Sequence, residues 1–149
     1  MTLALAANDI AARLDKSLAD GIVEAGRDSL LVKSESLPDI ASFLKTEPGL
    51  EFNYLVHITA VDYNDYFELV YHLVSLKHNH SLVIKTRCYD REAPTTPSLV
   101  SLWRGADLQE REIFDLMGIS FDGHPNMKRI FLWEGFPGHP LRKDFSDGA

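Results

Sequence analysis

Residues 54–88, YLVHITAVDYNDYFELVYHLVSLKHNHSLVIKTRC, contain three segments in which apolar and polar side chains alternate. Alternation with a period of two is typical of β-strands that bury one face. The polar segments 62–65 and 78–80 between them are typical of turns, so the pattern predicts an antiparallel meander of three long strands. The three apolar series are Tyr54, Val56, Ile58 and Ala60, then Phe67, Leu69, Tyr71 and Leu73, then Leu82, Ile84, Thr86 and Cys88.

Two helices are predicted before this meander. Apolar side chains recur at helical spacing in residues 10–18, and Asn8 or Asp9 can cap that helix. A second helix is expected to begin at Ser36, with a proline in its first turn, and to end before Pro48.

A short hairpin is predicted between these helices, because apolar residues 22–23 and 30–32 flank the turn residues 26–28. The expected fold is α+β, a two-layer sandwich in which two N-terminal helices cover a mixed, mostly antiparallel sheet. We expect a single domain made of the sandwich in residues 1–93, a helical segment in 94–118, and residues 119–149, which we call the C-terminal arm.

Composition excludes several classes of function. The chain has 149 residues and 45% hydrophobic content, as expected for one domain with one core. The net charge is -7 and there is no basic cluster, so nucleic acid is a poor candidate partner. The sequence has no run of about eighteen apolar residues, so we do not expect a membrane span. The segment MTLALAA lacks the basic residues of a signal peptide.

The chain contains one cysteine, Cys88, which we expect to be a core residue. A single cysteine forms no internal disulfide and cannot by itself hold an iron-sulfur cluster or a structural zinc ion, and this usage favours a reducing, cytosolic compartment.

Residues 110–118, EREIFDLMG, concentrate charge on one predicted helix. With Asp107 as N-cap, Glu110 stands at the third helical position and completes a capping box. The positions of Asp107, Arg111 and Asp115 also predict a ladder in which one arginine lies between two carboxylates. Such a ladder matters most when it is buried at an interface, where the guanidinium forms specific bidentate contacts.

Glu110 falls on the apolar stripe of this helix and therefore needs a buried donor. We expect this donor to be an arginine, a lysine or a backbone N–H of the C-terminal arm or of a neighbouring subunit, with Arg129 and Arg142 as the candidates within the chain.

A catalytic interpretation pairs Glu110 or Glu112 with His124, either as acid and base or as metal ligands of a small hydrolase. No His-Glu-x-x-His or similar spacing supports it, so the structural interpretation is favoured. No phosphate-binding glycine loop, nucleophile elbow or redox pair is present.

His72, His78 and His80 are a second possible metal site. No acidic or cysteine ligand stands beside them in the sequence, so a polar hairpin turn is the favoured interpretation.

The C-terminal arm is rich in proline and glycine, which exclude a regular helix, yet it is too apolar for a free tail. Its apolar side chains must be covered by this domain or by a neighbouring subunit. They are Ile130, Phe131, Leu132, Trp133, Phe136, Leu141 and Phe145.

Several strings, in order along residues 52–145, carry a family resemblance: residues 55–63, 67–73, 97–99 with Trp103, 110–119, Phe121, 123–125, 129–130 and 138–145. They resemble the C subunit of respiratory complex I, the NADH:quinone oxidoreductase C-subunit family, whose member in chloroplast-type complexes is called the J subunit. The resemblance implies a non-catalytic structural subunit of the hydrophilic peripheral arm, on the cytoplasmic face of the inner membrane. Its motif residues, expected at interfaces, are Glu110, Arg111, Glu112, Asp115, Gly118, His124, Pro125, Arg129, His139, Pro140, Arg142, Lys143 and Asp144.

The resemblance further implies that the chain binds no cofactor, and that iron-sulfur clusters and quinone belong to partner subunits. The expected partners are the large D subunit beside the quinone cavity, which the C-terminal arm would embrace, and the cluster-bearing B and I subunits. The same module is similar to subunits of membrane-bound energy-converting hydrogenases and of related dehydrogenases with other electron donors. That alternative stays open at the level of sequence.

Overall fold

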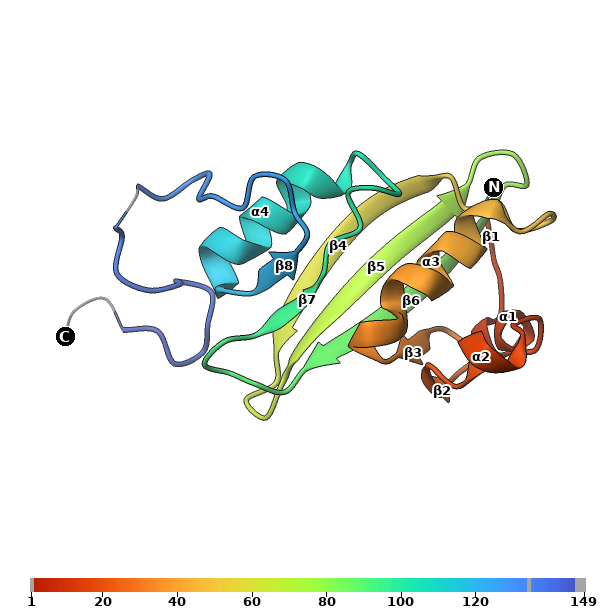
Figure 1. Cartoon of the computed structure of the whole chain (residues 1–149), viewed down its shortest axis with the longest axis horizontal. Coiled ribbons are helices and arrows are strands. Elements are labelled where there is room, and N and C mark those ends of the chain that lie inside the picture. The colour runs from red at the N-terminus through yellow and green to blue at the C-terminus, as the bar shows by residue number, and fades with distance from the viewer. Residues whose placement is uncertain (1, 134, 147–149) are drawn as a thin grey trace.

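Three long antiparallel strands dominate the fold, in a computed structural model that describes residues 2–133 and 135–146. They are β4 (Tyr54–Asp62), β5 (Phe67–Ser75) and β6 (His80–Cys88), and they form the predicted meander. The meander belongs to a six-stranded sheet (Figure 1). Five of its strands follow the order β2 (Ile22–Ala25), β3 (Leu30–Val32), β6, β5, β4, and the sixth, β1 (Leu3–Ala4), pairs with β6 beside this series. Strand β4 therefore lies at one edge of the sheet.

The remaining strands of this sheet come from the N-terminal part of the chain. Strands β2 (Ile22–Ala25) and β3 (Leu30–Val32) form the predicted antiparallel hairpin. Strand β3 runs parallel to β6, and so does β1 (Leu3–Ala4). The sheet is consequently mixed, and the α+β class is confirmed.

Helix α3 (Leu37–Thr46) follows a 3₁₀ turn at Ser34–Ser36 and lies across one face of the sheet (Figure 1). It has proline in its first turn, as predicted, where the missing N–H costs no helical hydrogen bond. Its fully buried side chains join those of the central strands in one core; they are Leu37, Ile40, Ala41 and Leu44.

The first predicted helix is interrupted. It consists of α1 (Ala7–Ala11) and α2 (Lys16–Ala19), because the Asp15 side chain accepts a 3.0 Å bond from the Leu18 N–H and begins a new helix. The N-cap of α1 is Ala6, without a side-chain bond, so the prediction that Asn8 or Asp9 caps one continuous helix was wrong.

A bulge near the start of β4 changes which of its side chains are buried. The pairing with β5 shifts register between Leu55 and His57. As a result Leu55 and Ile58 are 2% and 5% exposed, whereas Tyr54 and Val56 are 49% and 44% exposed. The predicted alternation was therefore wrong at this end of the strand, since a bulge inserts one residue and reverses the faces before it.

The second half of the chain adds helix α4 (Ala106–Met117), which contacts β4. Strands β7 (Thr95–Pro97) and β8 (Ser120–Asp122) flank this helix in sequence and pair in parallel. The rest of the C-terminal arm is irregular, as predicted, and lies beside α4 at one end of the molecule (Figure 1). Residues 134 and 147–149 of the arm lie outside the described residues.

Candidate functional site: helix α4 and the C-terminal arm

Helix α4 begins without the predicted capping box. Its N-cap is Gly105, which has no side chain to form a cap, and Asp107 is already inside the helix. The Glu110 side chain points into the core instead of reaching back to the N-terminus of the helix.

Glu110 is fully buried, as its place on the apolar stripe predicts. Its two carboxylate oxygens accept bonds from the Ser98 hydroxyl at 2.6 Å and from the Leu99 N–H at 2.8 Å. Burial raises the pKa of Glu110, and these two hydrogen bonds oppose that rise. A backbone N–H, one of the expected kinds of donor, does bind Glu110, but it belongs to the segment before α4, and neither Arg129 nor Arg142 of the arm is a donor. The carboxylate therefore fixes the segment before α4.

Asp115 holds the C-terminal arm through its backbone. Its Oδ2 atom accepts three N–H groups, from Ile130 at 3.2 Å, Phe131 at 2.7 Å and Leu132 at 3.0 Å. Arg129 adds an ion pair, with Nη1 3.6 Å from Oδ1. Burial alone raises the pKa of Asp115, but the three N–H groups and Arg129 together hold it below its ordinary value.

Arg111 also binds the arm and forms no ladder. Its Nε and Nη2 atoms donate to the carbonyl oxygens of Lys128 and Arg129 at 3.1 and 3.2 Å. Asp107 and Asp115 pair elsewhere, with His124 and Arg129. The predicted ladder along the helix was wrong because the arm offers all three side chains closer partners.

The C-terminal end of α4 is capped by the arm. Helix ends leave carbonyl groups without a partner, and here three of them are satisfied by one segment of the arm. His139 Nδ1 donates to the Asp115 carbonyl at 3.0 Å, the Leu141 N–H to that of Leu116 at 2.9 Å, and Arg142 Nε to that of Met117 at 2.6 Å. Pro140 lies half-buried within this segment.

Gly118 permits this close approach. Its φ of +76° ends the helix in the left-handed conformation. A Cβ atom at this position would come within 2.6 Å of His139 Cδ2 and 2.7 Å of Arg142 Nη2. The glycine therefore serves both the turn and the contact with the arm.

A second anchor holds the arm at the end of β4. Arg91 donates two hydrogen bonds to Asp62 at 2.7 and 3.0 Å, and the backbone N–H of Lys143 donates to the same carboxylate at 3.0 Å. Asp144 pairs with Arg91 at 3.4 Å. The bonds from Arg91 hold the pKa of Asp62 well below its ordinary value.

His124 has a structural role. Its Nδ1 accepts the Asn126 N–H at 2.9 Å, so its Nε2 carries the proton and faces the Asp107 carbonyl at 3.1 Å and carboxylate at 3.0 Å. Pro125, between His124 and Asn126, is exposed. Both ring nitrogens of His124 are therefore engaged.

The residues of the hydrolase interpretation do not converge. Glu110 and Glu112 are two positions apart and project about 200° apart around the helix axis, one into the core and the other onto the surface. Over residues 2–133 and 135–146, no group of three or more His, Cys, Asp or Glu side chains could hold a metal ion.

The three histidines of the second possible metal site do not form one group, since the rings of His78 and His80 stack with their centroids 5.4 Å apart while His72 lies beside a different residue. His80 is buried and bonds the Leu50 carbonyl at 2.9 Å, while His78 pairs with Glu51 at 2.9 Å. The predicted exposed turn is thus correct for His78 and wrong for His80. His72 lies on β5 with its ring beside His57 of β4.

The arm covers some of its apolar side chains and presents others outward. Ile130, Leu132, Phe136 and Phe145 are half-buried. Phe131, Trp133 and Leu141 are 65%, 64% and 60% exposed. The arm is therefore held on helix α4 by hydrogen bonds and ion pairs, while three of its large apolar side chains remain exposed. This arrangement is expected for a docking element.

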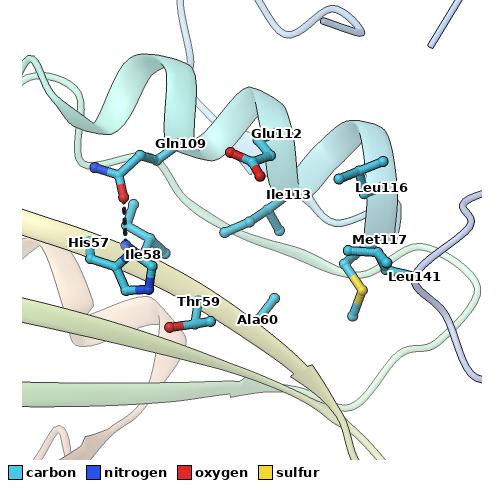
Figure 2. Close-up of a pocket in the computed structure, with 10 residues that line it drawn as sticks. All are labelled: His57, Ile58, Thr59, Ala60, Gln109, Glu112, Ile113, Leu116, Met117 and Leu141. Atoms are coloured by element: carbon cyan, nitrogen blue, oxygen red, sulfur yellow. Dashed lines mark hydrogen bonds between the residues drawn. The ribbon is translucent and has the colours of Figure 1, made fainter. Parts of the chain in front are cut away.

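A groove beside this surface separates α4 from the edge strand β4 (Figure 2). Figure 2 shows side chains of both elements facing the space between them, with Gln109 bonded to the Ile58 N–H at 2.7 Å. The groove has a volume of about 180 Å³. Glu112 of the predicted motif and Leu141 of the arm both line it.

Sequence reasoning missed three members of this arrangement: Asp62, Arg91 and Ser98. Asp62 and Ser98 belong to strings that carried the resemblance, but the sequence assigned neither of them a partner. Asp62 binds Lys143 and Arg91 binds Asp144, which are 81 and 53 positions away, and no spacing pattern in the sequence predicts contacts over such distances. Only the packed structure brings these residues to the ends of α4 and the arm.

Comparison with known proteins identifies the family. Residues 30–148 match the family model described as respiratory-chain NADH dehydrogenase, 30 Kd subunit. The chain belongs to this family. It is 42% identical over 144 residues to the C subunit of NADH-quinone oxidoreductase from Roseiflexus sp. (strain RS-1), covering 92% of this chain and 82% of that protein. It is 44% identical over 136 residues to the corresponding protein of Moorella thermoacetica, covering 89% and 90%.

A solved structure with the same fold supports this membership of the 30 Kd subunit family. It is a chain of the membrane-bound sulfane sulfur reductase, described as an archaeal respiratory membrane complex, with a TM-score of 0.70 and 27% identity. The similarity covers 80% of this chain and 71% of that chain. In the part of this chain that the structure describes, no helix combines the length and apolarity that crossing a membrane requires.

Proposed function

We propose that this member of the 30 Kd subunit family is a non-catalytic structural subunit of a proton-translocating NADH:quinone oxidoreductase, in the hydrophilic peripheral arm of that complex. Family membership over residues 30–148 supports the assignment. The observation that carries the structural role is the Asp115 contact, in which one buried carboxylate binds three successive N–H groups of the arm. That contact fixes the backbone of exposed Phe131, and exposed Trp133 follows directly after the bonded residues.

The proposed partner of this surface is the large D subunit, which the arm braces beside the quinone cavity, with the B and I subunits as neighbours. Exposed large apolar side chains, here Phe131, Trp133 and Leu141, are typical of surfaces that dock a partner. We place the chain on the cytoplasmic face of the inner membrane, as a peripheral protein held by its partners.

Iron-sulfur clusters and quinone are proposed to belong to the partner subunits. Cluster ligation requires several thiolates, and this chain has one cysteine. Burial raises the pKa of Cys88 to about 11, which keeps it a thiol rather than a thiolate ligand.

A second candidate is the equivalent subunit in a complex with another electron donor. The similarity to a chain of the sulfane sulfur reductase favours this candidate, because that complex is named for different chemistry.

Purification of the tagged chain from its native membrane, with identification of every accompanying subunit, tests both candidates. Recovery with an NADH-oxidising module and a quinone-site subunit supports the first, and recovery with hydrogenase or sulfur-reducing subunits supports the second. Recovery as a free monomer contradicts both.

A further inference from the structure

The groove between β4 and α4 has the size and the lining of a receptacle for one side chain. Its volume of about 180 Å³ is too small for a helix, which is about 10 Å across. Six of its ten lining residues are apolar, and Figure 2 shows the lining side chains between α4 and β4. The apolar side chains are Ile58, Ala60, Ile113, Leu116, Met117 and Leu141.

Gln109 and Glu112 are the polar side chains of α4 that line this groove, and within the part of the chain that the structure describes only Gln109 is hydrogen-bonded. Gln109 is engaged through both its oxygen and its nitrogen, because it accepts from the Ile58 N–H at 2.7 Å and donates to the Gly105 carbonyl at 3.1 Å. Glu112 is exposed and has no hydrogen bond or ion pair with any residue that the structure describes. No lysine or arginine among the described residues lines the groove.

The backbone of β4 also presents polar groups on the side that faces α4. The Ile58 N–H points away from β5, toward α4. Because the outward direction recurs at every second residue of an antiparallel edge strand, the N–H and C=O of Ala60 face the same side. An edge strand with outward backbone groups accepts an extended segment through main-chain hydrogen bonds.

We propose that this groove receives one lysine or arginine side chain, carried on an extended segment of a partner subunit. The aliphatic stem packs on Ile113 and Leu116, and the cationic end binds the Glu112 carboxylate. Long basic side chains commonly bury their stems on apolar surface and keep their charge at its rim, and a partly desolvated ion pair adds specificity. This inference rests on the proposed function, since it requires a partner subunit.

The net charge of -7 also favours a cationic occupant over a second copy of the chain, because two copies repel each other.

The experiment compares three tagged variants expressed in the native host and purified as the complex. Glu112→Lys reverses the charge in the groove, Glu112→Gln removes it with little change of shape, and Glu24→Lys is the matched control. Glu24 is exposed on β2, at the opposite edge of the sheet. Recovery of partner subunits is measured against the wild-type chain, and each isolated variant is also melted.

We expect Glu112→Lys to lower recovery of the partner about tenfold and Glu112→Gln to lower it less, with Glu24→Lys unchanged. All three isolated variants should melt as the wild-type chain does. Wild-type recovery with Glu112→Lys overturns the inference. A charge-dependent dimer of the isolated chain in sedimentation also overturns it, because the occupant is then a second copy.

Failure of the proposed function gives a different result. In that case even the wild-type chain purifies without respiratory subunits, whereas failure of this inference alone leaves a complete complex that is indifferent to residue 112.

Discussion

The Oδ2 atom of Asp115 lies 2.7 Å from the backbone nitrogen of Phe131, across sixteen positions of sequence. The same oxygen accepts hydrogen bonds from the N–H groups of Ile130 and Leu132. The backbone of this part of the arm is therefore bonded to a carboxylate of helix α4 rather than to a neighbouring strand. Hydrogen bonds to a buried carboxylate are stronger than those between neutral groups. This contact explains how an irregular, proline-rich segment keeps a defined position without regular secondary structure.

Replacement of Asp115 should release the arm while the sheet stays folded. Asp115→Ala removes the acceptor for three N–H groups, and we expect the free energy of unfolding to fall by about 3 kcal/mol. Hydrogen exchange should accelerate most at residues 130–132. Asp122→Ala, at an exposed aspartate of β8, is the control and should leave both quantities unchanged. Uniform acceleration over the whole sheet would instead make Asp115 a core residue.

Acid should weaken the attachment of the arm. The pKa values of Asp62 and Asp115 in the folded protein lie below the ordinary value of 3.8. Their contribution to the free energy of unfolding is therefore complete above about pH 4, and it is lost as the pH falls through their pKa values in the folded protein. The pKa of Glu110 is raised, so its contribution has the opposite sign and declines as the pH rises through the folded value.

The measurement for this prediction is urea unfolding between about pH 3 and pH 7. The wild-type chain should lose stability below about pH 4, and a chain with both Asp62→Asn and Asp115→Asn should start lower and change less there. Equal slopes for the two proteins would assign the acid sensitivity to other carboxylates.

Gly118 and Gly123 form a matched pair. Both have positive φ, +76° and +87°, but only Gly118 has atoms of the arm where a Cβ would stand. Gly123→Ala should cost about 1 kcal/mol from backbone strain alone. Gly118→Ala should cost more and should also displace His139 and Arg142, seen as faster proteolysis of the arm. Equal effects of the two substitutions would remove the close-packing role of Gly118.

Replacement by glutamine should lower the stability of the chain at Glu110 but not at Glu112, two residues away on the same helix. Glu110→Gln replaces two hydrogen bonds to a carboxylate with two neutral ones, since the amide oxygen can accept from the Leu99 N–H and the NH₂ group can donate to the Ser98 hydroxyl, and we expect a loss of about 1 kcal/mol. Glu112→Gln should leave the melting temperature unchanged, because Glu112 has no polar contact in the described residues. Thermal melts of the two isolated variants are sufficient. A stable Glu110→Gln variant would show that the segment before α4 does not depend on this carboxylate.

The meander, the N-terminal hairpin and helix α3 could be predicted because their signals are local. Alternation, turn residues and the proline in the first turn of α3 each act within a few residues. The bulge in β4 could not be predicted, since it depends on how Leu55 and His57 pair with the neighbouring strand. The interruption of the first helix could not be predicted either, since the Leu18 N–H can donate to the Asp15 side chain or to a backbone carbonyl of a continuous helix.

The charges of α4 were located by sequence, but their partners were not. Spacing along the helix predicted that Arg111 would bind Asp107 and Asp115, whereas its donors reach carbonyl groups of the arm. Helical spacing describes neighbours on one helix only and cannot weigh them against a segment that returns from elsewhere. The burial of Glu110 followed from its place on the apolar stripe, and the identity of its donors did not.

The exposed apolar side chains beside the Asp115 contact should be required for docking of the partner subunit. Phe131→Ser and Trp133→Ser, made together in the tagged chain, should leave the melting temperature of the isolated protein unchanged, because both side chains are mostly exposed. The same double variant should no longer recover the large partner subunit from the native membrane, since the centre of the interface is lost. The control is Leu76→Ser, at a turn residue that is 65% exposed, as Phe131 is. Loss of the partner in the double variant alone is the predicted result, and full recovery of the partner would contradict the role of the arm as a docking element.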